Sequence, residues 1–162
     1  MKNTVHTLTL LLSLLVAGTA HADLTFRIAL SAAPPSKGNP FSTIGTTPTF
    51  LWTAIYDRLT DIDNEGNIVP ELALSWQSVN DLEWHFKLRP NVKFSNGEPV
   101  TAQSVKTVFD LMRNDRINAV YWSRQEGFYP LVEVIDELTV AFHTLKPNAV
   151  LPAYLSALFI AP

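Results

Sequence analysis

Apolar and polar side chains alternate over residues 83–89 of the chain. Trp84, Phe86 and Leu88 fall on one face of this stretch, and the other face carries charged residues and a histidine. A period of two is typical of a strand with one buried face. Each large apolar side chain contributes roughly 1.5–3 kcal/mol when it is buried, which is enough to fix the inward face. The pattern therefore predicts a half-buried strand.

A turn and a helix are predicted directly after this strand. Residues 95–97, Ser-Asn-Gly, tolerate positive φ, so we expect the chain to reverse direction there. Thr101 is a favourable N-cap, and the apolar residues that follow it recur at the i, i+3, i+4 and i+7 positions of one helix face. That face consists of Val105, Val108, Phe109 and Met112.

The chain ahead of these elements predicts another strand, a loop and another helix. Residues 24–30 are rich in β-forming residues, and the Pro-containing stretch 31–40 has the composition of a loop. Thr47 and Pro48 suit the cap and the first position of a helix. The predicted apolar stripe of this helix is Leu51, Ala54, Ile55 and Leu59.

Residues 61–68 partly match a calcium-binding loop, because acidic residues and a glycine occupy several of its characteristic positions. The twelfth position, which needs a bidentate Glu, is Leu72, and Pro70 stands where a helix would begin. A hairpin turn centred on residues 64–66 explains the same residues. We therefore expect a turn here and no calcium site.

Further hairpins and a helix complete a mixed pattern. The Asn80-Asp81 pair predicts a hairpin corner. Residues 131–135 and 139–145 predict a second hairpin that turns at residues 136–137, and residues 148–158 predict a last helix. The expected fold class is α/β in the broad sense, with strands and helices mixed (α+β).

The first 22 residues have the pattern of a signal peptide. Lys2 gives a short positive end, residues 8–16 are almost wholly apolar, and Ala20-His21-Ala22 supplies small residues for cleavage. The apolar run is shorter than the ~20 residues that a membrane span needs. We expect export to the periplasm and cleavage after Ala22; an uncleaved membrane anchor is the alternative.

Composition narrows the functional classes. The net charge is −3, and loss of Lys2 with the leader makes the mature chain one unit more negative. A mildly acidic chain without a basic run is not expected to bind nucleic acid. The chain contains no cysteine, so we expect neither disulfides nor a lipid anchor at the cleavage site. Residues 23–162 are enough for one core of ordinary size.

Four motifs follow one another along the chain. Residues 70–76 read Pro-x-Leu-Ala-x-Ser-Trp, residues 86–94 read Phe-x-Leu-Arg-x-x-Val-Lys-Phe, and residues 97–105 read Gly-x-Pro-Val-Thr-Ala-x-x-Val. Residues 132–147 add Val-x-x-x-Asp-x-x-Thr-Val-x-Phe-x-x-Leu-x-Pro. In this order and spacing the motifs resemble extracellular solute-binding protein family 5, the periplasmic binding proteins of peptide- and nickel-type ABC transporters. One departure is Ser104, where the family usually has Asp, and we expect slightly weaker helix initiation there.

The resemblance implies a fold and a domain organisation. Residues 23–162 would form the N-terminal portion of a class II (cluster C) periplasmic binding protein, which is the small accessory domain plus the first strand of the larger lobe. The chain ends among apolar residues at 159–162, so we expect it to be a truncated version of a longer pattern. Tyr56, Asp57 and Leu59 match the family's Tyr-Asp/Glu-x-Leu, which core packing explains.

The resemblance also implies solute-contacting residues. The loop after the first strand borders the ligand cleft in the family, which points to Pro34, Pro35 and Ser36. Tyr121 and Trp122 lie near the family segment whose aromatic rings face peptide side chains. Both assignments have a plainer alternative, namely a connecting loop for residues 34–36 and core packing for the aromatic residues.

The implied function is the substrate-binding component of an ABC importer, which captures a peptide-like or other small solute and delivers it to inner-membrane permease subunits. We expect a monomer with no cofactor, no metal and no catalysis, because no nucleophile motif is present and the mature chain has no close-spaced histidine pair. One alternative is a truncated or pseudogene product of the same family without binding activity. Another is a secreted hydrolase.

Cleavage of the leader is directly testable. When the full chain is expressed in a Gram-negative host, the exported protein should begin at Asp23, because the small residues before it suit signal peptidase. N-terminal sequencing of the periplasmic fraction measures this. Protein that begins at Met1 and stays with the membrane would contradict it.

Overall fold

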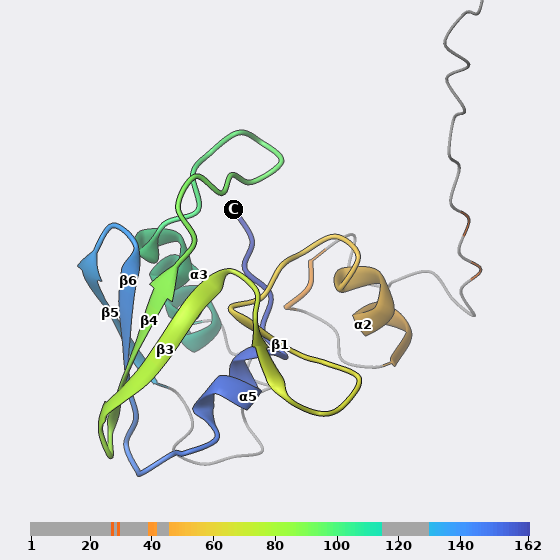
Figure 1. Ribbon diagram of the computed structural model, residues 1–162. Coiled ribbons are helices and arrows are strands. Elements are labelled where there is room, and N and C mark those ends of the chain that lie inside the picture. The colour runs from red at the N-terminus through yellow and green to blue at the C-terminus, as the bar shows by residue number, and fades with distance from the viewer. Residues whose placement is uncertain (1–26, 28, 30–38, 42–45, 115–129) are drawn as a thin grey trace, which may run out of the picture. The chain divides into compact units, whose positions relative to one another are not determined.

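A four-stranded antiparallel sheet, here called the main sheet, dominates the computed structural model of the protein (Figure 1). The structure describes residues 27, 29, 39–41, 46–114 and 130–162. Residues 1–30 and 31–162 form separate units, and the elements below belong to the second. The main sheet has the order β3 (Ala73–Asn80), β4 (Glu83–Leu88), β6 (Thr139–His143), β5 (Leu131–Asp136). The remaining elements are β1 (Thr60–Ile62), β2 (Ile68–Pro70), α2 (Thr46–Trp52), α3 (Ala102–Asn114) and α5 (Leu151–Leu155).

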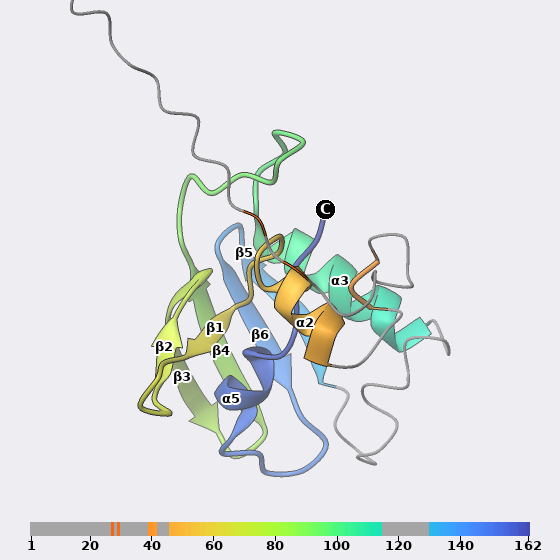
Figure 2. The same cartoon turned by 90° about the vertical axis from the view of Figure 1, so that its right-hand side faces the viewer.

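One face of the main sheet is packed against α3, which lies along β5 and β6 (Figure 2). Phe86 and Leu88 on β4 are fully buried there, and Trp84 is half-buried, as the alternation predicted. The ring of Phe142 lies between two others: its centroid is 5.2 Å from that of Phe86 and 5.0 Å from that of Phe109, both edge-to-face. The predicted half-buried strand is confirmed.

The predicted helix after the strand is also confirmed as α3, and its four-residue apolar stripe is buried. Thr101 caps it, because its Oγ1 accepts the N–H of Ser104 at 3.3 Å. Ser104 in turn accepts the N–H of Thr101 through its Oγ at 3.2 Å. This is a capping box closed by Ser104 instead of an acid. Ser104 therefore lacks the negative charge of the family's Asp at the helix N-terminus, but the N-cap hydrogen bonds are kept.

The turn between β4 and α3 also matches the prediction. Gly97 has φ of +90°, and its N–H donates to the carbonyl of Phe94 at 2.9 Å. Asn96 Oδ1 accepts the N–H of Glu98 at 3.0 Å. A side chain at residue 97 would be strained at this φ, which explains the glycine.

The β1–β2 hairpin replaces the calcium-loop alternative. Asp63 Oδ1 accepts the backbone N–H groups of Glu65 at 2.9 Å and Asn67 at 2.8 Å, and Gly66 has φ of +87°. These hydrogen bonds, above all the one from the Asn67 backbone, hold the pKa of the Asp63 carboxyl below its usual value. The acidic residue serves the turn itself. The predicted corner at Asn80-Asp81 and the β5–β6 hairpin are likewise confirmed.

The predicted helix over residues 47–59 is wrong in its second half. α2 ends at Trp52; Ala54 and Ile55 are exposed, and Leu59 is buried in the core beyond the helix. The reason is long-range pairing: Arg58 forms a β-bridge with Phe159, and the carbonyl of Leu59 accepts the N–H of Ala73. An extended segment at this point satisfies more backbone groups than another helical turn would.

The last helix is shorter than predicted, and the first strand is untested. α5 spans Leu151–Leu155 rather than residues 148–158, because the chain becomes extended where Phe159 pairs with Arg58. Arg27 and Ala29 adopt no regular secondary structure, and the rest of the predicted strand over residues 24–30 lies outside the described residues. Within the described ranges, no helix is long and apolar enough to span a membrane.

Arg58 joins three segments by its guanidinium group. Its Nε is 3.0 Å from Glu71 Oε2, its Nη2 is 2.9 Å from Asp61 Oδ1, and its Nη1 donates to the carbonyl of Ser156 at 3.3 Å. Burial raises the pKa of the Glu71 carboxyl, although the charge of Arg58 opposes this shift. The β1–β2 hairpin and the end of α5 are thereby held to one side chain.

Replacement of Glu71 by Gln tests this burial. The pKa of Glu71 is raised in the folded state, so the folded protein binds the proton of this carboxyl more tightly than the unfolded chain does. The resulting stabilisation is present at low pH and is lost as the pH rises through the folded-state pKa. The free energy of unfolding of the wild type, relative to that of Glu71→Gln, should therefore increase as the pH falls from 7 to about 4. Urea unfolding at the two pH values measures it, and a difference that moves the other way would contradict the assignment.

Loss of the cap of α3 should destabilise the protein. Thr101→Ala removes the oxygen that accepts the Ser104 N–H, at an expected cost of about 1 kcal/mol in the free energy of unfolding. Thr101→Ser keeps the oxygen and should stay close to the wild type. Chemical unfolding of the wild type and the two variants measures the free energies of unfolding. An equal loss of stability in Thr101→Ala and Thr101→Ser would show that the Thr101 hydroxyl does not account for the effect.

Candidate functional site

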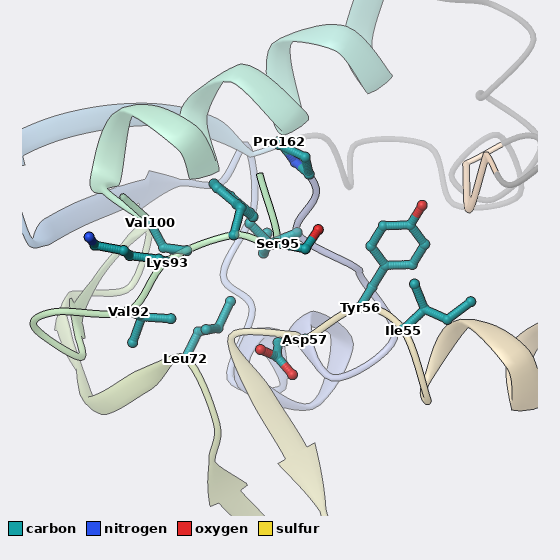
Figure 3. Close-up of a pocket in the computed structure, with 11 residues that line it drawn as sticks. Ile55, Tyr56, Asp57, Leu72, Val92, Lys93, Ser95, Val100 and Pro162 are labelled. Carbon is teal, nitrogen blue, oxygen red and sulfur yellow. The ribbon is translucent and has the colours of Figure 1, made fainter. Parts of the chain in front are cut away.

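A pocket of about 310 Å³ lies beside the chain segment that follows α2 (Figure 3). Ile55 and Tyr56 form one side of it, and Val92 and Val100 lie on the other. Most of the remaining lining is apolar as well, and consists of Leu72, Phe94, Ile160 and Pro162. A hollow of this size with an apolar lining suits one apolar side chain or a small ligand.

Polar groups stand at the margin of this pocket. Asp57, Lys93 and Ser95 contribute a carboxylate, an amine and a hydroxyl group. No histidine or cysteine belongs to the lining residues of the pocket. Its geometry suits binding.

The outer face of the main sheet, opposite α3, carries both of its histidines and several other polar side chains. A shallow hollow of about 320 Å³ there is lined by Ser75, Trp76, Gln77, His85, Lys87 and Thr139. His85 Nε2 is 2.7 Å from Glu83 Oε1, and His143 Nε2 is 3.0 Å from Glu133 Oε2. The hydrogen bond with His85 lowers the pKa of the Glu83 carboxyl.

Each histidine of this face is thus engaged by a glutamate. In the part of the chain that the structure describes, no group of three or more His, Cys, Asp or Glu residues could hold a metal ion.

The sequence-predicted site residues all fall outside the described residues. Pro34, Pro35 and Ser36 lie in one such stretch, and Tyr121 and Trp122 lie in the other, so the structure neither places them nor brings them together. The sequence assigned Tyr56 and Asp57 to core packing and did not predict the pocket beside them. No pattern in the sequence predicts this pocket, because the exposure of Ile55 depends on where α2 ends.

Comparison with known proteins identifies the family. The model of the bacterial extracellular solute-binding proteins, family 5 Middle, matches residues 67–162. A probable D,D-dipeptide-binding periplasmic protein of Escherichia coli, DdpA, is 32% identical over 126 residues, which cover 73% of this chain and 23% of that protein. A putative ABC transporter peptide-binding protein of Brucella ovis is 32% identical over 138 residues, which cover 83% of this chain and 26% of that protein.

Solved structures give the same result. The binding protein MoaA in complex with mannopinic acid, from Agrobacterium tumefaciens R10, superimposes with a TM-score of 0.65 and 32% identity, over 76% of this chain and 27% of that one. OppA of Burkholderia pseudomallei, at 23% identity, shares the fold with a TM-score of 0.60. The chain thus spans about a quarter of the length of DdpA and of the Brucella ovis protein. Its strands, α3 and motifs make it a member of the bacterial extracellular solute-binding proteins, family 5.

Proposed function

We propose that the chain is part of the substrate-binding component of an ABC importer, which captures a peptide-like solute in the periplasm and delivers it to inner-membrane permease subunits. The observation that carries this proposal is the family match over residues 67–162, which contain the main sheet and α3. The names of two relatives, a D,D-dipeptide-binding and a peptide-binding protein, support a peptide-like ligand. A nickel-binding periplasmic protein of Escherichia coli, 33% identical over 90 residues, marks another ligand class among the relatives.

Capture would follow the general physics of two-lobed binding proteins. Two lobes close about a hinge around the ligand, and an extended peptide is held largely through its backbone hydrogen bonds. Pro34 and Pro35 lack an N–H, so this part of the loop would offer carbonyl oxygens to the N–H groups of the solute. Tyr121 and Trp122 would cover its side chains.

The rest of the proposal concerns the state of the protein. We place it in the periplasm after cleavage behind Ala22, as a monomer that binds without catalysing a reaction and needs no cofactor. The family match supports binding rather than hydrolysis, since the relatives that it groups with this chain are named as binding proteins.

Direct binding tests the proposal. Calorimetric titration of residues 23–162 with Ala-Ala-Ala should give a weak but saturable signal, with a Kd of about 0.1–1 mM, because one part of a two-lobed cleft buries only part of a ligand. Tyr121→Ala and Trp122→Ala should each raise Kd at least about fivefold, since a large aromatic contact is lost.

The matched control is Leu145→Ala, which removes an exposed apolar side chain on the loop between β6 and α5 and should leave Kd unchanged. If the titration releases no heat at any peptide concentration, the alternative of a family member without binding activity is favoured. Turnover of a peptide or ester by the purified protein would favour the hydrolase.

A further inference from the structure

The hollow on the outer face of the main sheet is built by three neighbouring strands. Ser75 and Gln77 come from β3, His85 and Lys87 from β4, and Thr139 from β6. The strand pairing places Ser75 opposite Lys87, Lys87 opposite Thr139, and Gln77 opposite His85. Directly opposed residues of an antiparallel pair carry their side chains on the same face, close enough to share a ligand. The register of the sheet therefore brings these five side chains to one hollow of about 320 Å³.

Hydrogen-bond donors predominate in this hollow. Lys87 contributes an amine, Ser75 a hydroxyl and Gln77 an amide, and none of the described residues that line the hollow carries a carboxylate. Within the described part of the chain, the side chains of Ser75 and Gln77 make no hydrogen bond, and the Lys87 amine makes no ion pair. The hollow thus offers one permanent positive charge and two neutral donors to a ligand.

The acidic side chains nearby are already engaged by other donors. Glu83 Oε1 is 2.7 Å from His85 Nε2, and Asp136 Oδ1 accepts the N–H of Leu138 at 2.8 Å. The Leu138 hydrogen bond is the main reason why the pKa of the Asp136 carboxyl is below its usual value, and the charge of Lys87 has a smaller share. Neither carboxylate uses up the Lys87 amine, so this amine can bind an external anion.

His85 can add a second positive charge. An ionised carboxylate only accepts, so the Nε2 that faces Glu83 carries a proton in both charge states of the ring. The other nitrogen, Nδ1, is an acceptor in the neutral ring and a donor in the charged ring. On its own strand His85 is flanked by Glu83 and Lys87, β3 has no charged residue, and on β6 the nearby His143 pairs with Glu133. A ligand that can only accept would therefore bind together with a proton at His85.

We propose that this hollow is a binding site for a small carboxylate, which the Lys87 amine and the protonated His85 ring hold through charge-assisted hydrogen bonds while Ser75 and Gln77 supply neutral donors. The single charge of a carboxylate matches the one permanent charge of the hollow. A phosphate dianion fits less well, because Glu83 and Asp136 stand beside the two cationic groups. The proposed solute-contacting residues do not belong to this site, which is independent of the proposed function.

An NMR titration tests the site. Acetate is added to the purified ¹⁵N-labelled protein at about pH 6 and about pH 8, at constant ionic strength. The backbone amides of Gln77, His85, Lys87 and Thr139 should shift saturably at the lower pH, with a Kd of about 10 mM, because exposed charged contacts are weak. At the higher pH the Kd should be at least about fivefold larger, since His85 is then neutral. Acetamide, which has the same shape without the charge, should cause no saturable shift.

Substitutions of Lys87 separate its charge from its bulk. Lys87→Gln should raise the Kd for acetate at least about fivefold at both pH values, whereas Lys87→Arg keeps the charge and should stay within about twofold of the wild type. Lys87 is exposed, so neither change disturbs the core. The matched control is Lys106→Gln on α3, which makes the same change of charge on the opposite side of the sheet (Figure 2) and should leave the Kd unchanged.

Substitutions of the two histidines identify the source of the pH dependence. His85→Gln should make the Kd at about pH 6 equal to that at about pH 8, because the group that takes up the proton is lost. His143→Gln should keep the difference between the two pH values. A pH dependence that disappears with His143→Gln and persists with His85→Gln would contradict the role of His85.

Three outcomes would overturn the proposal as a whole. One is the absence of a saturable shift with acetate, and another is an equal response to acetate and acetamide. The third is an equal effect of Lys87→Gln and Lys106→Gln, which would show that only the net charge of the protein matters. Tighter binding of inorganic phosphate than of acetate would contradict the assignment to a carboxylate.

Discussion

The edge-to-face contact of Phe142 with Phe86 on one side and Phe109 on the other is the interaction on which the described structure depends. Phe86 belongs to β4, Phe142 to β6 and Phe109 to α3, so three elements separated along the chain meet at one ring. Phe86 and Phe142 are fully removed from solvent. Burial of large aromatic surfaces is the strongest apolar contribution available to a chain of this size, and the edge-to-face geometry adds to it.

A second constraint acts through the backbone. The segment after α2 leaves the helical path because Arg58 pairs with Phe159, and the N–H of Ile160 donates to the carbonyl of Asp57 at 2.9 Å. The guanidinium group of Arg58 reinforces the same junction through Glu71 and the Ser156 carbonyl. This junction also forms one side of the apolar pocket. The pocket and the exposure of Ile55 are therefore consequences of the pairing of Arg58 with Phe159.

Two surfaces of different chemistry result. On the outer face of the main sheet, each histidine has a glutamate partner. At the end of α2 and just after it, by contrast, Phe50 and Ile55 expose apolar side chains.

The sequence by itself determined the elements whose stability is local. The alternation over residues 83–89, the helical spacing from Val105 to Met112, the Thr101 cap and the glycine at residue 97 each encode their conformation within a few residues, and the motifs built on them were enough to indicate the family. Only the tertiary structure decided where α2 stops and that Ile55 faces solvent while Leu59 is buried. Both follow from the pairing of Arg58 with Phe159, about 100 residues away, and no local pattern contains that pairing. The solute-contacting residues at 34–36 and 121–122 lie outside the described ranges, and they stay predictions.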